Sequence, residues 1–110
     1  MSLAIIELLI GNVCNAVVHE ILGNAINDEN VRSHYGNELK ASFDKARSYR
    51  EKINPINHAL PDKDALYVRD KIIREVKQEL NARISKGYGN IDLSLVEQTV
   101  DNMLKQMNII

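Results

Sequence analysis

An apolar helical segment at residues 3–26 constrains this chain more than any other feature. Its apolar residues leave only a narrow polar stripe, which follows four-residue steps through Glu7, Gly11, Asn15, His19 and Gly23. A helix that is apolar nearly all round belongs in the centre of a core or in a subunit interface. We therefore expect three neighbouring helices to cover it, or a second copy of the chain to do so through Val17 and Ile21.

The same segment does not have the pattern of a membrane span or a signal peptide. No Lys or Arg precedes its apolar part, as a signal peptide would require. Polar and charged residues also interrupt the apolar run, at Glu7, Asn12, Asn15, His19 and Glu20. The one cysteine, Cys14, lies inside the apolar run and has no second cysteine to pair with. A lone thiol of this kind is typical of a reducing compartment, so we expect no membrane contact and a cytoplasmic location.

The rest of the chain predicts three more helices and no strands. Apolar residues at three- and four-residue steps indicate a helix over 28–53, with a possible break at Gly36. A third helix is expected from Pro61 or Asp62 to Lys86, ended by Gly87, and a fourth from Asp92. In the third helix we expect Leu66, Ile73 and Leu80 to form the buried face, which is widened by Ala65, Val68, Ile72, Val76 and Ile84. The prediction is an all-α, four-helix, bundle-like antiparallel domain that spans residues 1–110.

No catalytic or cofactor motif is present. The histidines and the cysteine lack metal-ligand spacing, and the Gly87–Asn90 turn lacks a phosphate-binding pattern. The net charge is −1, from 14 Lys and Arg against 15 Asp and Glu, which argues against a nucleic-acid partner. We therefore expect a non-catalytic protein with no metal and no cofactor.

One pair of residues supports an alternative. Arg50 and His58 resemble the Arg and His of small helical ribonucleases of the HEPN type, although seven residues, Pro55 among them, separate the pair here and the family's spacing is shorter. The resemblance implies that the histidine acts as general base and the arginine stabilises phosphate charge. An RNA-binding or RNA-cleaving domain is therefore the second hypothesis.

Protein binding is the first hypothesis. Tyrosine is favoured at interfaces, and Tyr49, Tyr67 and Tyr88 are the candidates on the second and third helices. Beside Tyr67, the acids Asp62 and Asp64 could face a basic partner. The most concrete form of this hypothesis is an immunity or antitoxin-like inhibitor, of the bacterial or phage type, that blocks a partner enzyme. A structural homodimer through the first helix is the remaining alternative.

Overall fold

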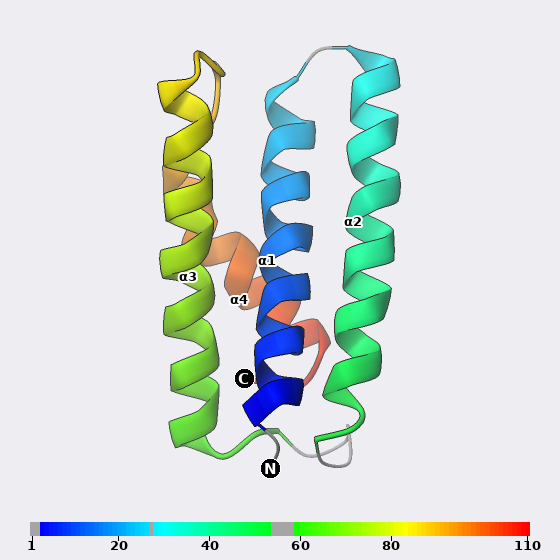
Figure 1. The fold of residues 1–110 in the computed structure, drawn as a ribbon, viewed down its shortest axis with the longest axis vertical. Helices are drawn as coiled ribbons and strands as arrows, with labels where there is room; N and C mark the ends of the chain where they lie inside the picture. Colours follow the sequence, from blue (N-terminus) through cyan, green and yellow to red (C-terminus); the bar gives the residue numbers. More distant parts are fainter. Residues whose placement is uncertain (1–2, 27, 54–58) are drawn as a thin grey trace.

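The computed structural model describes residues 3–26, 28–53 and 59–110, and these residues form helices joined by turns (Figure 1). The α-helices are α1 (Leu3–Ala25), α2 (Glu29–Arg50), α3 (Asp62–Ser85) and α4 (Val96–Gln106), and a short 3-10 helix, η1 (Leu93–Leu95), precedes α4. The predicted all-α, bundle-like fold is confirmed.

Helix α1 is the centre of the fold. Figure 1 shows α2 and α3 on either side of it and α4 crossing behind it at an angle. Consecutive helices run in opposite directions, so the neighbours α1 and α3 run parallel to each other. The chain's own helices bury Val17 and Ile21, which are 0% and 2% exposed. The expected dimer through this pair would therefore require those helices to move aside.

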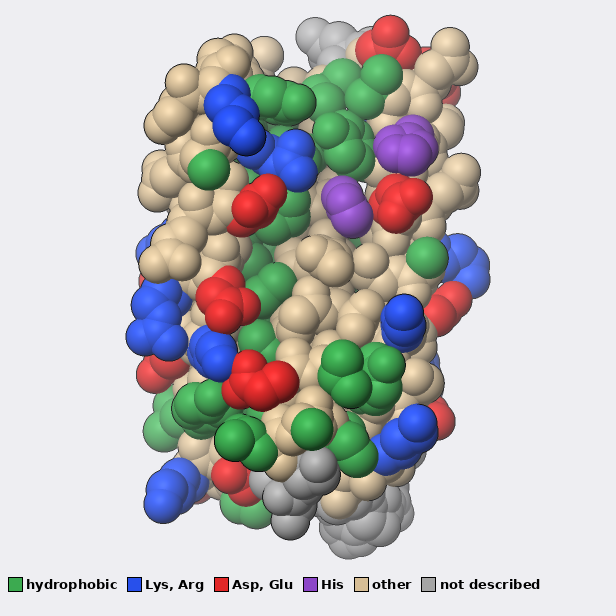
Figure 2. Space-filling model, viewed as in Figure 1, with side chains coloured by type: hydrophobic (Ala, Val, Ile, Leu, Met, Phe, Trp, Pro, Cys, Tyr) green, Lys and Arg blue, Asp and Glu red, His purple; other side chains and the backbone are tan. Residues whose placement is uncertain are grey.

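The polar stripe of α1 faces the side that α4 does not cover. Gly11 and Asn15 are exposed, and Glu7, His19 and Gly23 are half-buried. Figure 2 looks onto this side and shows acidic and basic side chains alternating along the boundary between α1 and α3. The stripe therefore marks the open face of the central helix, while the remaining faces pack into the core.

Local signals in the sequence account for the helix ends. The Asp28 carboxylate accepts hydrogen bonds from the backbone N–H groups of Asn30 (2.9 Å) and Val31 (3.2 Å), which caps α2. Helix α2 then continues through Gly36 without the break that we considered. Gly87 ends α3 with a left-handed φ of 97°. The Asp92 carboxylate caps η1 rather than α4, so the last α-helix begins four residues after the predicted start. The predicted role of Ser2 as a cap lies outside the described residues.

The buried face of α3 consists of predicted residues, but Leu66, Ile73 and Ile84 of the predicted face are not fully buried. Its buried residues recur at three- or four-residue steps: Ala65, Val68, Ile72, Val76 and Leu80. Leu66 and Ile73 are each displaced by one position from this set, which corresponds to about 100° around a helix of 3.6 residues per turn. Ile73 is half-buried and Leu66 is 59% exposed. The prediction that Leu66 packs in the core is therefore wrong.

Within the described residues, α1 alone is long and apolar enough to cross a membrane by length and composition. The core helix of a soluble protein meets the same criterion. In this fold, 56% of the apolar stretch of α1 is buried against the rest of the chain.

Candidate protein-binding surface

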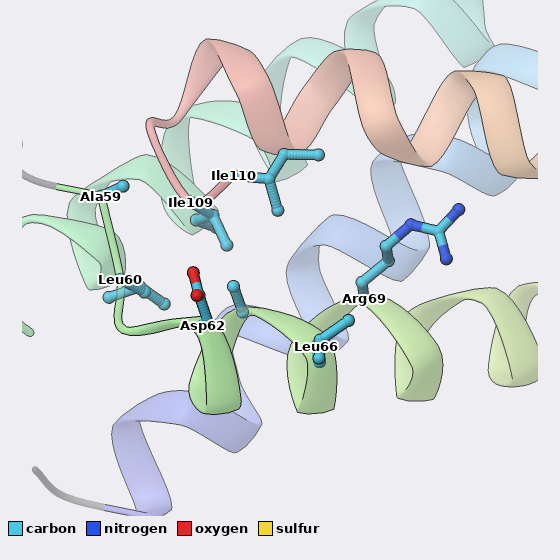
Figure 3. Close-up of a pocket in the computed structure, with 8 residues that line it drawn as sticks. Ala59, Leu60, Asp62, Leu66, Arg69, Ile109 and Ile110 are labelled. Atoms are coloured by element: carbon cyan, nitrogen blue, oxygen red, sulfur yellow. The ribbon is translucent and has the colours of Figure 1, made fainter.

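A pocket of about 380 Å³ lies between the first turns of α3 and the last residues of the chain. Its walls are mostly apolar, with one acid and one base at the rim: Ala59, Leu60, Asp62, Ala65, Leu66, Arg69, Ile109 and Ile110. Figure 3 shows Ile109 and Ile110 reaching from the end of α4 toward these turns of α3. The pocket is thus an apolar depression at one end of the molecule.

The turn after α4 positions the residues that form one wall of this pocket. Asn108 adopts a left-handed φ of 54°, and the N–H of Ile109 donates to the Leu104 carbonyl at 2.8 Å. This Schellman-type ending reverses the chain, so that Ile109 is buried and Ile110 stays partly exposed. The Arg50 Nη2 group donates to the Asn108 carbonyl at 3.0 Å and fixes the turn from α2.

The charged side chains at the rim differ in how they are held. Arg69 is bound by the Asp101 carboxylate through two hydrogen bonds of 2.7 and 3.2 Å, which direct its guanidinium toward α4. Asp62 has no hydrogen bond or ion pair with another described residue, and the same holds for Asp64. Asp62 therefore presents a free carboxylate at the rim of the apolar pocket, whereas Asp64, about 200° further around α3, does not line it.

Large apolar side chains are unusually exposed at this end. Leu3 is 66% exposed, Leu66 59%, Tyr67 44% and Ile110 39%. Figure 2, which looks onto the side opposite α4, shows hydrophobic side chains near both ends of the open face. Scattered exposed apolar residues are ordinary, but Leu66 and Ile110 line the same pocket, and grouping of this kind marks an interaction surface.

A hydrogen-bonded group joins α1 to α3 at the edge of this surface. The Lys71 ammonium donates to the Glu7 carboxylate at 2.6 Å, and the Tyr67 hydroxyl donates to the same carboxylate at 2.8 Å. The hydrogen bond from Lys71, together with the one from Tyr67, lowers the pKa of Glu7 below its usual value. The group fixes the position of the Tyr67 ring, while 44% of that residue stays open to solvent.

The structure brings some of the predicted partner-binding residues together and separates others. Asp62, Asp64 and Tyr67 share the first two turns of α3. Tyr88 lies past the opposite end of α3, where Arg83 stands over its ring at 5.8 Å. Tyr49 is half-buried against the core near the end of α2. Sequence reasoning did not identify Leu66 and Ile110 as surface residues, and these are the large exposed apolar side chains of the pocket.

The ion pairs of α3 run both within the helix and to its neighbours. The sequence offers three pairs at four-residue spacing, Asp70–Arg74, Lys71–Glu75 and Glu79–Arg83, and of these Glu79–Arg83 forms, at 3.3 Å. Lys71 pairs with Glu7 instead of Glu75, and Lys77 pairs with Glu97 at 3.6 Å. With Arg69, three of the six bases of α3 therefore pair with acids of neighbouring helices, which reduces the positive charge that is free for a nucleic acid.

The other reactive side chains do not form a catalytic site. Burial, with the nearby Glu75 carboxylate, raises the pKa of the Cys14 thiol to about 12, so the nucleophilic thiolate is scarce at neutral pH. No group of three or more His, Cys, Asp or Glu side chains in residues 3–26, 28–53 and 59–110 could hold a metal ion. Arg50 is 0% exposed and holds the Asn108 turn, so it is closed to an RNA phosphate. His58 lies outside the described residues.

Comparison of the chain with protein-family models, with curated proteins and with solved structures finds no match.

Proposed function

We propose that this chain is a non-catalytic protein-binding domain and that its partner docks on the pocket at the start of α3. The observation that carries the proposal is the position of Leu66, which is 59% exposed at the rim of an apolar pocket. A side chain of this size contributes about 1.5–3 kcal/mol when it is fully removed from water. A partner that covers Leu66 would obtain part of that energy.

The chemistry of the surface indicates the chemistry of the partner. The pocket suits an apolar side chain, and the free carboxylate of Asp62 suits a base beside it. Complementary charge at the edge of an interface mainly speeds association and selects the correct partner. We therefore expect the partner to present an apolar anchor with Lys or Arg next to it.

The most concrete form of the proposal is an inhibitor that covers the active site of a partner enzyme. Two features support a binding role over an enzymatic one: the surface described above, and the raised pKa of the Cys14 thiol. If the pocket is left free for a different protein and not filled by a second copy, sedimentation of the purified chain should show a monomer. A dimer that dissociates in Leu66→Asp would instead show that a second copy occupies the pocket.

Affinity capture tests the proposal. The wild-type chain and Leu66→Asp are used in parallel as bait in lysate of the native host, and captured proteins are quantified by mass spectrometry. A stoichiometric protein held by the wild type and lost by Leu66→Asp supports the proposal. If both baits capture the same proteins in the same amounts, the pocket is not the docking site.

A further inference from the structure

A second pocket, of about 280 Å³, lies between α1, α2 and α4. Its lining combines one carboxylate, one cation, two amides and three apolar side chains: Glu20, Lys40, Asn102, Gln106, Leu39, Phe43 and Met103. Pockets for drug-sized ligands run from roughly 300 to 1,000 Å³. This pocket is therefore suited to a single side chain.

Glu20 is the unusual member of this lining. It is half-buried on α1, and no hydrogen bond or ion pair joins it to another described residue. Burial raises the pKa of its carboxyl, and no neighbouring group offsets that effect. Removing a carboxylate from water without a partner costs free energy, and no hydrogen bond or ion pair of the described residues offsets that cost for Glu20.

The one cation of the lining does not neutralise Glu20. The Lys40 ammonium pairs with Asp44 at 3.0 Å, one turn along α2, and its side chain is 78% exposed. The amide oxygens of Asn102 and Gln106 add hydrogen-bond acceptors beside Glu20, and Phe43 adds an aromatic ring. Acceptors, a carboxylate and a ring together favour a planar cation on an aliphatic stem.

We infer that this pocket receives an arginine side chain of the partner protein, an inference that rests on the proposed function. The guanidinium would donate to Glu20 and to the amide oxygens, and the stem would pack on Leu39, Phe43 and Met103. Arginine is enriched in interfaces because its guanidinium is weakly hydrated and donates in a fixed geometry.

The linings of the two pockets share the end of α4. Gln106 lines the arginine pocket and Ile109 lines the apolar pocket. Because three residues of extended chain span at most about 11 Å, these two lining residues lie close together at this end of the helix.

Nuclear magnetic resonance tests the inference without the partner. The probe is N-acetyl-arginine amide, titrated into the isotope-labelled chain at neutral pH, and N-acetyl-citrulline amide is the uncharged control of nearly the same shape. We expect the arginine probe to shift amides of the pocket lining, and the citrulline probe to bind at least tenfold more weakly. Equal shifts from both probes, or no shifts from either, would overturn the inference.

Two variants sharpen the test. Glu20→Gln should weaken binding of the arginine probe at least tenfold, whereas Lys40→Gln should leave it unchanged or strengthen it. Glu20→Gln also removes a desolvated charge, so its melting temperature should equal or exceed that of the wild type. Lost binding therefore cannot be attributed to unfolding. Glu51→Gln, an exposed carboxylate elsewhere, serves as the control and should bind the probe as the wild type does.

The failure of this inference can be told apart from that of the proposed function. If Leu66→Asp loses the captured partner but Glu20→Gln binds it with full affinity, the arginine pocket is wrong and the protein-binding function stands. If the probe binds at Glu20 but wild type and Leu66→Asp capture the same proteins, the pocket is a cation site and the proposed function fails.

Discussion

The middle of α1 and the beginning of α3 carry the same kinds of side chain, but these side chains differ in how much of their surface is exposed. Val17 and Leu22 are completely covered by the chain's own helices, whereas Leu66 is 59% exposed. Helix α1 has α2 and α3 on its two sides and α4 behind it, whereas the start of α3 lies at one edge of the fold (Figure 1). Position in the fold, rather than residue type, thus separates a core from a surface that is left for a partner.

The largest expected effect is a loss of stability when a core residue of α1 is truncated. Leu22→Ala should lower the free energy of unfolding by about 2–5 kcal/mol, because it opens a cavity among packed side chains. Leu66→Ala should change it by no more than about 0.5 kcal/mol, because the side chain is largely in water. Urea denaturation monitored by circular dichroism measures both. Equal losses would show that Leu66 is a core residue and not a binding residue.

The next effect concerns the turn that builds the pocket. Arg50→Met keeps much of the side-chain volume but removes the donor to the Asn108 carbonyl, and it should cost roughly 2 kcal/mol, typical of a hydrogen bond to a charged group. Hydrogen exchange should also quicken at residues 107–110. Arg47→Met is the matched control, since Arg47 is half-exposed and its nearest acid lies at 3.8 Å. A stability loss in Arg47→Met as large as in Arg50→Met would contradict the role of Arg50.

A smaller effect compares two ion pairs. The side chains of Arg69 and Asp101 are 29% and 30% exposed and share two hydrogen bonds, whereas those of Lys40 and Asp44 are 78% and 61% exposed. A double-mutant cycle should give about 1 kcal/mol for Arg69–Asp101 and about 0.3 kcal/mol for Lys40–Asp44, since exposed pairs are screened by water. Equal coupling energies would show that Arg69 is not held in place at the rim of the pocket.

The smallest effect is a dependence of stability on pH that comes from His19, on the open face of α1. Burial is the main reason that the pKa of His19 is lowered; the Arg83 and His34 charges lower it further, and Glu38 acts in the opposite direction. His19 also stacks on Tyr35, with ring centroids 5.7 Å apart. Below the ordinary histidine pKa of about 6.5, the unfolded chain takes up a proton more readily than the folded one. Stability should therefore fall as the pH drops below this value.

His19→Gln should flatten that part of the stability profile, measured by thermal unfolding between pH 7 and pH 5. Lys45→Gln, a change at an exposed side chain of α2 that is not among the causes of the His19 shift, is the control and should keep the wild-type dependence of stability on pH. If His19→Gln keeps the wild-type profile of stability against pH, another group causes the loss of stability at low pH.

Much of the fold follows from local patterns. Asp28, Gly87 and Asp92 end or begin helices for reasons that lie within a few residues, so the sequence predicts the helices and most of their bounds. The apolar character of α1 likewise predicts its central position. These features depend on backbone hydrogen bonds and on the period of 3.6 residues.

The site was harder to predict because it depends on contacts between distant segments. The steps of three and four from Ala65 to Leu80 predict the buried face of α3 correctly. The same pattern also includes Leu66 and Ile84, which are exposed because neighbouring helices do not cover them. Nothing local to Arg50 indicates its contact with Asn108, 58 residues away.

The affinity of the captured partner for two variants of α3 tests the binding surface most directly. Leu66 and Ile84 are exposed apolar residues near opposite ends of the same helix, and Ile84 is 39% exposed. Titration calorimetry with the partner should show Kd about thirtyfold weaker or more for Leu66→Asp, as for a central interface residue, and a wild-type Kd for Ile84→Asp. If Ile84→Asp weakens binding as much as Leu66→Asp, or if neither does, the pocket at the start of α3 is not the binding surface.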